Sequence, residues 1–95
     1  MSAHGGTREH GATQGRFAIR KGDEEAELTY SVTTPTLIIA DHTGVPDSFR
    51  GTGAGLALVE ALVAAARKDG FKVVPLCPFV NATRKKHPEW ADVFV

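Results

Sequence analysis

The chain has 95 residues, of which 42% are hydrophobic, and its eleven basic and eleven acidic residues give no net charge. This length fits one domain, and the balanced charge argues against nucleic acid or membrane surfaces as partners. No apolar run reaches the ~18 residues of a membrane-spanning helix, and no signal-peptide pattern is present. A single cysteine cannot form an internal disulfide, which suits a reducing, cytoplasmic location.

The N-terminal residues are mostly small or polar and show no apolar periodicity. Such a composition cannot bury enough apolar surface to order itself. We therefore expect Met1–Gly15 to be a disordered tail and residues 16–95 to form the folded domain.

Three strands are predicted next. Residues 16–21 alternate weakly, and Gly22-Asp23 is a hairpin turn signal. Ala26–Val32 alternates with a period of two, which puts its apolar residues on one face, and Pro35 ends it. Leu37–Ala40 is a short continuous apolar run, as expected of a central strand covered on both faces.

A helix, a strand and a short helix follow. The helix is predicted over about Thr52–Lys68, with Gly70 as the C′ residue just beyond its end. Its expected buried stripe is Leu56, Val59, Leu62, Val63 and Ala66. Phe71–Cys77 reads as a strand, and Asn81–Lys86 as a short helix that Pro88 stops. The fold class is thus α/β in the order βββαβα, and the strand–helix–strand crossover implies that its two flanking strands are parallel.

The most informative segment is a glycine-rich loop at the start of the long helix, Arg50-Gly51-Thr52-Gly53-Ala54-Gly55. Free N–H groups and the helix dipole at such a position favour a phosphate or pyrophosphate. A Walker loop is excluded because Leu56-Ala57 replaces its Lys-Ser or Lys-Thr, and the dinucleotide fingerprint fails at its third glycine. The alternative is a glycine-rich loop that only leads into a helix.

The spacing Arg50-x-x-Gly53-x-Gly55 resembles the pyrophosphate loop of the GNAT superfamily of N-acetyltransferases. Its flanks are Asp41-His42-Thr43-Gly44-Val45-Pro46, Pro75-Leu76-Cys77-Pro78-Phe79-Val80 and His87-Pro88-Glu89-Trp90. In this order they resemble very small, single-domain GNAT-like proteins. The resemblance covers the chain from about Arg16 to its end, and implies a minimal GNAT-like mixed sheet with a short C-terminal helix.

The resemblance also implies acetyl-coenzyme A as co-substrate. Its pyrophosphate would lie on Arg50, Gly51, Thr52, Gly53, Ala54, Gly55 and Leu56. The pantetheine arm would lie between two splayed strands, one ending near His42 and the other at Cys77. Asp41, Thr43 and Val45 on the first strand would then adjoin the thioester.

Two residues are catalytic candidates. His42 can act as general base or can hydrogen-bond backbone at a strand end. Cys77 can fill space as a buried thiol or accept the acetyl group covalently. Thr83 stands about where larger relatives carry a tyrosine acid, which puts that role in doubt. We expect no metal site, because no Cys-x-x-Cys or His-x-x-x-His pair is present.

Three functions remain open at this stage. The first is N-acetyl transfer from acetyl-coenzyme A to an amine on a small molecule or protein, and the second is a non-catalytic coenzyme A-binding module that acts through a protein partner. The third is a small interaction domain whose loop binds another anion. The residues Arg84–Lys86 are either a solvated face or contacts to the adenosine phosphate, and His87–Trp90 is either a helix stop with an aromatic plug or part of the function.

Overall fold

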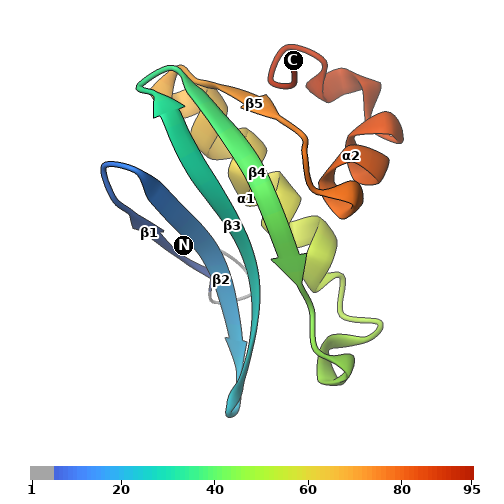
Figure 1. The fold of residues 1–95 in the computed structure, drawn as a ribbon. Coiled ribbons are helices and arrows are strands. Elements are labelled where there is room, and N and C mark those ends of the chain that lie inside the picture. The colour runs from blue at the N-terminus through green and yellow to red at the C-terminus, as the bar shows by residue number, and fades with distance from the viewer. Residues whose placement is uncertain (1–5) are drawn as a thin grey trace.

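The computed structural model describes residues 6–95, which form a five-stranded mixed sheet with two α-helices (Figure 1). The strand order follows the chain, with β1 to β4 antiparallel and β5 parallel to β4. The predicted α/β class and the parallel crossover through α1 are therefore confirmed. The elements are β1 (Gly6–His10), β2 (Gln14–Lys21), β3 (Glu24–Thr34), β4 (Leu37–Gly44), η1 (Asp47–Phe49), α1 (Ala54–Asp69), β5 (Lys72–Val74), α2 (Pro78–Lys85) and η2 (Pro88–Trp90).

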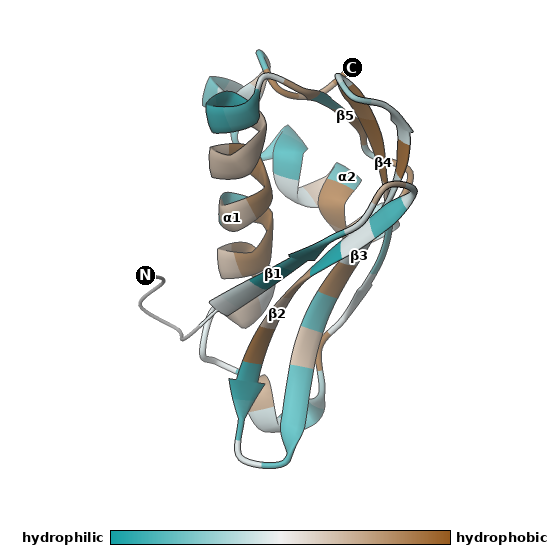
Figure 2. Cartoon of the chain, turned by 90° about the vertical axis from the view of Figure 1, so that its left-hand side faces the viewer, coloured by the Kyte–Doolittle hydropathy of each residue, from teal (hydrophilic) through white to brown (hydrophobic). Residues whose placement is uncertain are grey.

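Both α-helices pack on one face of the sheet (Figure 2). On β3 this face carries Ala26, Leu28 and Tyr30, which are buried as the alternation predicts. The prediction that Leu37–Ala40 is covered on both faces is wrong. Ile39 stays half-buried because its side of the sheet has no helix over it among the described residues. We call this second side the open face.

The long helix agrees with its prediction at both ends but not along its buried stripe. It begins two residues later and ends one residue later than expected, and Gly70 caps it with φ 77°. Leu56 was expected in the stripe but is 39% exposed. Leu58 is buried instead, because successive positions differ by about 100° around the helix axis and Leu56 falls at the edge of the buried arc.

Two later elements also differ from their predicted bounds. β5 ends at Val74, before Pro75, which has no N–H to donate to a ladder. α2 begins at Pro78 rather than Asn81, with proline near its first position where the missing N–H costs nothing. Cys77 is therefore the N-cap of a helix and not the last residue of a strand.

The prediction of a disordered tail through Gly15 is wrong for its described part. Gly6–His10 forms the edge strand β1, which pairs with β2 in the register Arg8 to Phe17 and His10 to Gly15. Apolar periodicity could not reveal this strand, because its helix-side positions carry polar residues. Residues 1–5 of the predicted tail lie outside the described residues.

Arg8 is the residue that fastens β1 to the rest of the fold. Its guanidinium carbon lies 5.3 Å from the ring centroid of Phe17 and 5.8 Å from that of Phe71. Its Nη1 donates to Asp69 at the end of α1 (2.9 Å), and its Nε donates to the Tyr30 hydroxyl (3.2 Å). β1, the sheet and the helix are thereby joined through one side chain.

Replacing Arg8 with alanine should lower the free energy of unfolding by about 2 kcal/mol, through lost cation–π contacts and a lost ion pair. For a domain of this size that corresponds to a melting temperature lower by about 10 °C. Thermal unfolding followed by circular dichroism measures it.

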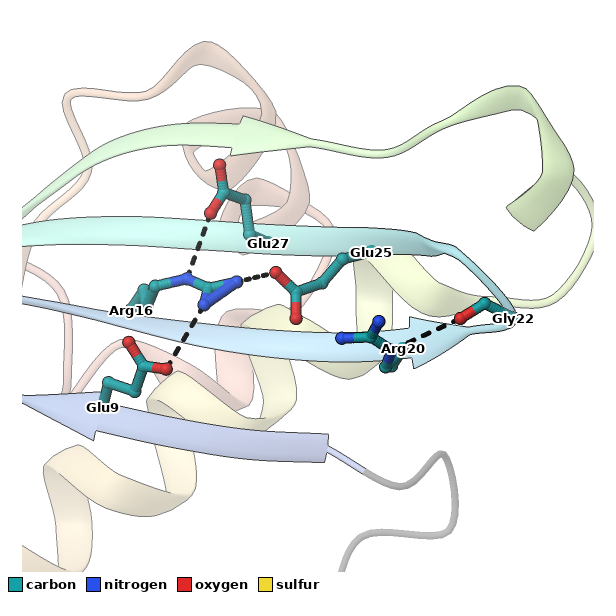
Figure 3. Close-up of polar contacts among 6 residues, drawn as sticks. All are labelled: Glu9, Arg16, Arg20, Gly22, Glu25 and Glu27. Atoms are coloured by element: carbon teal, nitrogen blue, oxygen red, sulfur yellow. Dashed lines mark hydrogen bonds and ion pairs between the residues drawn. The ribbon is translucent and has the colours of Figure 1, made fainter.

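The matched control is Arg16→Ala, one strand away. Arg16 bonds Glu9, Glu25 and Glu27 on the open face (Figure 3), and it packs on no aromatic ring of residues 6–95. Exposed ion pairs of this kind contribute less than about 1 kcal/mol. Equal losses from the two variants would contradict the role given to Arg8.

The ion pair between Arg8 and Asp69 is sensitive to acid. The hydrogen bond from Arg8 holds the pKa of Asp69 below its ordinary value of 3.8. A carboxylate with a lowered folded-state pKa stabilises the fold above its unfolded-state pKa, and the stabilisation is lost as the pH falls through the folded-state value.

We therefore expect the melting temperature of the wild type to fall more steeply than that of Asp69→Asn below about pH 4. At neutral pH the variant should be the less stable of the two. Parallel curves across the acid range would show that the Arg8 contact does not report on Asp69 ionisation.

Candidate active site

The glycine loop leads into α1 through two left-handed residues. Gly51 has φ 80° and Gly53, the N-cap of α1, has φ 75°. A Cβ at either position would meet no atom within 4 Å and would project into open space. The loop backbone is thus exposed, and these two positions keep side chains away from it.

The first turn of α1 is electropositive. It contains no acidic residue, and Gly53 supplies no side-chain cap. The Thr52 hydroxyl accepts from the N–H of Ala54 (3.3 Å) and donates to the carbonyl of Phe49 (2.6 Å). Arg50 is largely exposed, with its Nη2 3.6 Å from Asp47. Free N–H groups, the helix dipole and an available guanidinium favour an anion here.

β4 and β5 diverge beside this loop (Figure 1), and we call the region between their diverging ends the gap. β5 pairs with β4 only from Leu37 to Ile39. One further bond joins the Cys77 N–H to the carbonyl of Ala40 at 2.9 Å. Beyond it β4 continues to Gly44 while the chain turns into α2. The end of β4 therefore has backbone facing the gap without a β5 partner.

A β-bulge at the start of the gap decides which way each side chain points. Tyr30 pairs with Ala40, but its neighbour Thr29 pairs with His42, so Asp41 is the extra residue. The Asp41 carboxylate accepts a hydrogen bond from Ser31 on the open face (2.6 Å). Directly opposed residues share a face, so His42 lies on the open face with Thr29.

Thr43 points to the other side of the strand, where α2 begins. It pairs with the core residue Leu28, and its Oγ1 lies 3.3 Å from the Sγ of Cys77. Cys77 is a free, buried thiol. The structure thus brings Thr43 and Cys77 together, and it separates Cys77 from His42, which is exposed on the opposite face of the sheet.

Sequence reasoning missed Phe79, which joins the loop to the gap. Its ring lies against Gly55, where an added Cβ would come within 2.6 Å of Cζ. The early start of α2 at Pro78 places it there, so an N-terminal proline was the signal that could have revealed it. With Val45, Leu56 and Leu76, it is one of four exposed large apolar residues in the segments that border the loop and gap.

Thr83 faces the same side of α2 as Phe79, but its hydroxyl is already hydrogen-bonded. Its hydroxyl donates to the carbonyl of Phe79 at 2.8 Å. Tyr30 lies in the core, where its hydroxyl is 2.6 Å from Nδ1 of His10 and accepts from Arg8. Neither hydroxyl is placed to serve as an acid at the gap.

An electropositive helix start beside two diverging parallel strands is a place where an α/β domain can accept an anion. The family model of GCN5-related N-acetyltransferases matches residues 16–93. The chain belongs to this family.

The fold also resembles the solution NMR structure of a GCN5-like protein from Staphylococcus aureus. That structure is 29% identical in sequence with a TM-score of 0.70, and the match covers 100% of this chain and 91% of that one. No curated protein sequence matches the chain. Between residues 6 and 95, no helix has the length and apolar character to cross a membrane.

Proposed function

We propose that this protein transfers an acetyl group from acetyl-coenzyme A to an amine of a small molecule or protein, in the cytoplasm. Family membership supports acetyl transfer as the class of reaction. Acetyl-coenzyme A is proposed as the donor because the electropositive start of α1 has no side-chain cap and lies beside the gap between β4 and β5. A pyrophosphate on Arg50–Leu56 would direct the pantetheine arm into that gap, past Asp41, Thr43 and Val45.

The chemistry then requires few groups. The amine nitrogen attacks the thioester carbon, the carbon–sulfur bond breaks, the amine gives up a proton, and the departing thiolate takes one. Backbone N–H groups at the end of β4 would polarise the carbonyl. His42 on the open face is the base for an amine that approaches from that side, and Cys77 adjoins Thr43 on the other. Solvent water protonates the thiolate in this scheme.

The experiment is a titration of the isotope-labelled chain with acetyl-coenzyme A, followed by turnover with a panel of amines. Amide shifts should centre on Arg50–Leu56 and extend to Asp41–Val45. Unmoved amides at saturating ligand would refute the donor site.

A second function, a non-catalytic coenzyme A-binding module that acts through a protein partner, is favoured by one observation. The Thr83 hydroxyl is engaged with the carbonyl of Phe79, and the Tyr30 hydroxyl is engaged in the core. Tight binding of acetyl-coenzyme A without turnover of any amine would support this function over the first.

A further inference from the structure

A second hollow of about 390 Å³ lies at the far end of α2. It is lined mainly by Arg84, Lys85, His87, Pro88, Trp90 and Phe94. The C-terminal segment closes it, because after η2 the chain returns to the sheet and Phe94 bridges to Val73 of β5 (Figure 1). The hollow shares no lining residue with the loop at Arg50–Gly55.

Four of the five arginines outside this hollow are held by carboxylates. Arg8, Arg16, Arg50 and Arg67 each form an ion pair with a carboxylate. By contrast, no residue from Arg84 to Lys86 forms one within residues 6–95. Arg84 uses Nε to hold the Asn81 amide oxygen at 2.9 Å. A guanidinium oriented in this way loses little further freedom on binding an anion.

The floor of the hollow is aromatic. His87 stacks on Trp90 with ring centroids 4.1 Å apart and planes 14° from parallel. Nδ1 of His87 contacts Glu89 at 2.9 Å, which orients the ring. The engagement of Glu89 with His87 reduces the repulsion that this carboxylate exerts on an incoming anion. A flat aromatic surface beside the two adjacent cations Arg84 and Lys85 suits a base with an attached phosphate.

We propose that this hollow binds a phosphorylated nucleoside, with the base against His87 and Trp90 and the phosphate on Arg84 and Lys85. Two sources share this chemistry: a free nucleotide and the nucleotide end of coenzyme A. The second rests on the proposed function. It is compatible with α2, whose eight residues span about 12 Å between Phe79 at the glycine loop and the hollow.

Trp90 is the only tryptophan of the chain, so its fluorescence reports on this hollow alone. Adenosine bisphosphate added to the full chain should quench it saturably, with excitation at the red edge of the indole band to avoid adenine absorption. Arg84→Ala combined with Lys85→Ala should weaken the affinity by about tenfold or more. Arg20→Ala combined with Lys68→Ala removes the same charge elsewhere and should leave it unchanged.

Amide chemical-shift changes in the wild-type chain on addition of adenosine bisphosphate test the same site without any substitution. They should fall on residues 84–94. Absence of saturable quenching, or equal affinity in the two double variants, would overturn the proposal. Quenching by inorganic phosphate with the same affinity would also overturn it, because the base would then contribute nothing.

Gly53→Val separates the two sources. If coenzyme A supplies the nucleotide, acetyl-coenzyme A quenches Trp90 in the wild type and loses much of its affinity in this variant, while adenosine bisphosphate retains its own. If the source is a free nucleotide, acetyl-coenzyme A binds no more tightly than adenosine bisphosphate, and its affinity does not change in this variant. Failure of acetyl transfer alone leaves the quenching by adenosine bisphosphate intact, so the two proposals fail separately.

Discussion

Replacing Gly53 with valine is expected to remove most of the affinity for acetyl-coenzyme A from a protein that remains folded. Gly53 adopts φ 75° as the N-cap of α1, and an added side chain would project into the open space over the first helical turn. A phosphate needs that space to reach the N–H groups. Isothermal titration calorimetry measures the loss directly.

The matched control is Gly22→Val in the hairpin between β2 and β3. Gly22 also has a positive φ, of 61°, and also faces open space. Each variant should cost about 1–2 kcal/mol of stability for forcing a branched residue into the left-handed region. Only Gly53→Val should lose most of its affinity for the ligand. Wild-type affinity in Gly53→Val would show that the donor does not contact this loop.

Replacing His42 with alanine should lower the rate of acetyl transfer by ~10²-fold while leaving the affinity for acetyl-coenzyme A unchanged. The reason is that His42 lies on the open face, opposite the side of β4 where Thr43 meets Cys77. It would therefore contact the incoming amine and not the donor. Steady-state kinetics with a reactive amine, together with calorimetry, separate the two quantities.

His42→Gln serves as control, because glutamine keeps a hydrogen-bonding group without the ability to take a proton at neutral pH. Both variants should lose rate if His42 is the base. Recovery of wild-type rate in His42→Gln would instead assign the residue a purely hydrogen-bonding role.

Cys77 tests the same mechanism from the other side of the strand. Cys77→Ser should retain binding and some transfer, because no cation adjoins the buried thiol in sequence to make it a standing thiolate. Intact mass spectrometry after mixing with acetyl-coenzyme A should show no stoichiometric adduct. An adduct that an amine then removes would replace direct transfer with a covalent route.

Local patterns predicted the elements whose signals are local. The apolar alternation of β3, the turn at Gly22 and the end of α1 at Gly70 all followed from residue spacing. The anion-binding loop could likewise be predicted, because both its glycines and the helix start lie within one short segment.

Features that depend on tertiary packing could not be predicted in this way. β1 is held by Arg8 and His10, polar residues whose partners Asp69 and Tyr30 are distant in sequence. The contact of Phe79 with Gly55 likewise depends on how α2 sits against α1. Long-range contacts between polar or small residues leave no periodic trace in the sequence.

The bulge at Asp41 has a consequence for comparing related chains. In a regular ladder Asp41 would pair with Thr29, and the next residue, His42, would then face Cys77 while Thr43 moved to the open face. The register of β4, and not only its residue types, therefore determines on which face of the sheet His42 and Thr43 lie. In two relatives with identical residues at these positions, the histidine can lie on opposite faces of the sheet if only one of them has the bulge. An alignment must therefore establish whether the bulge follows the position of Ala40 before it treats the two histidines as equivalent.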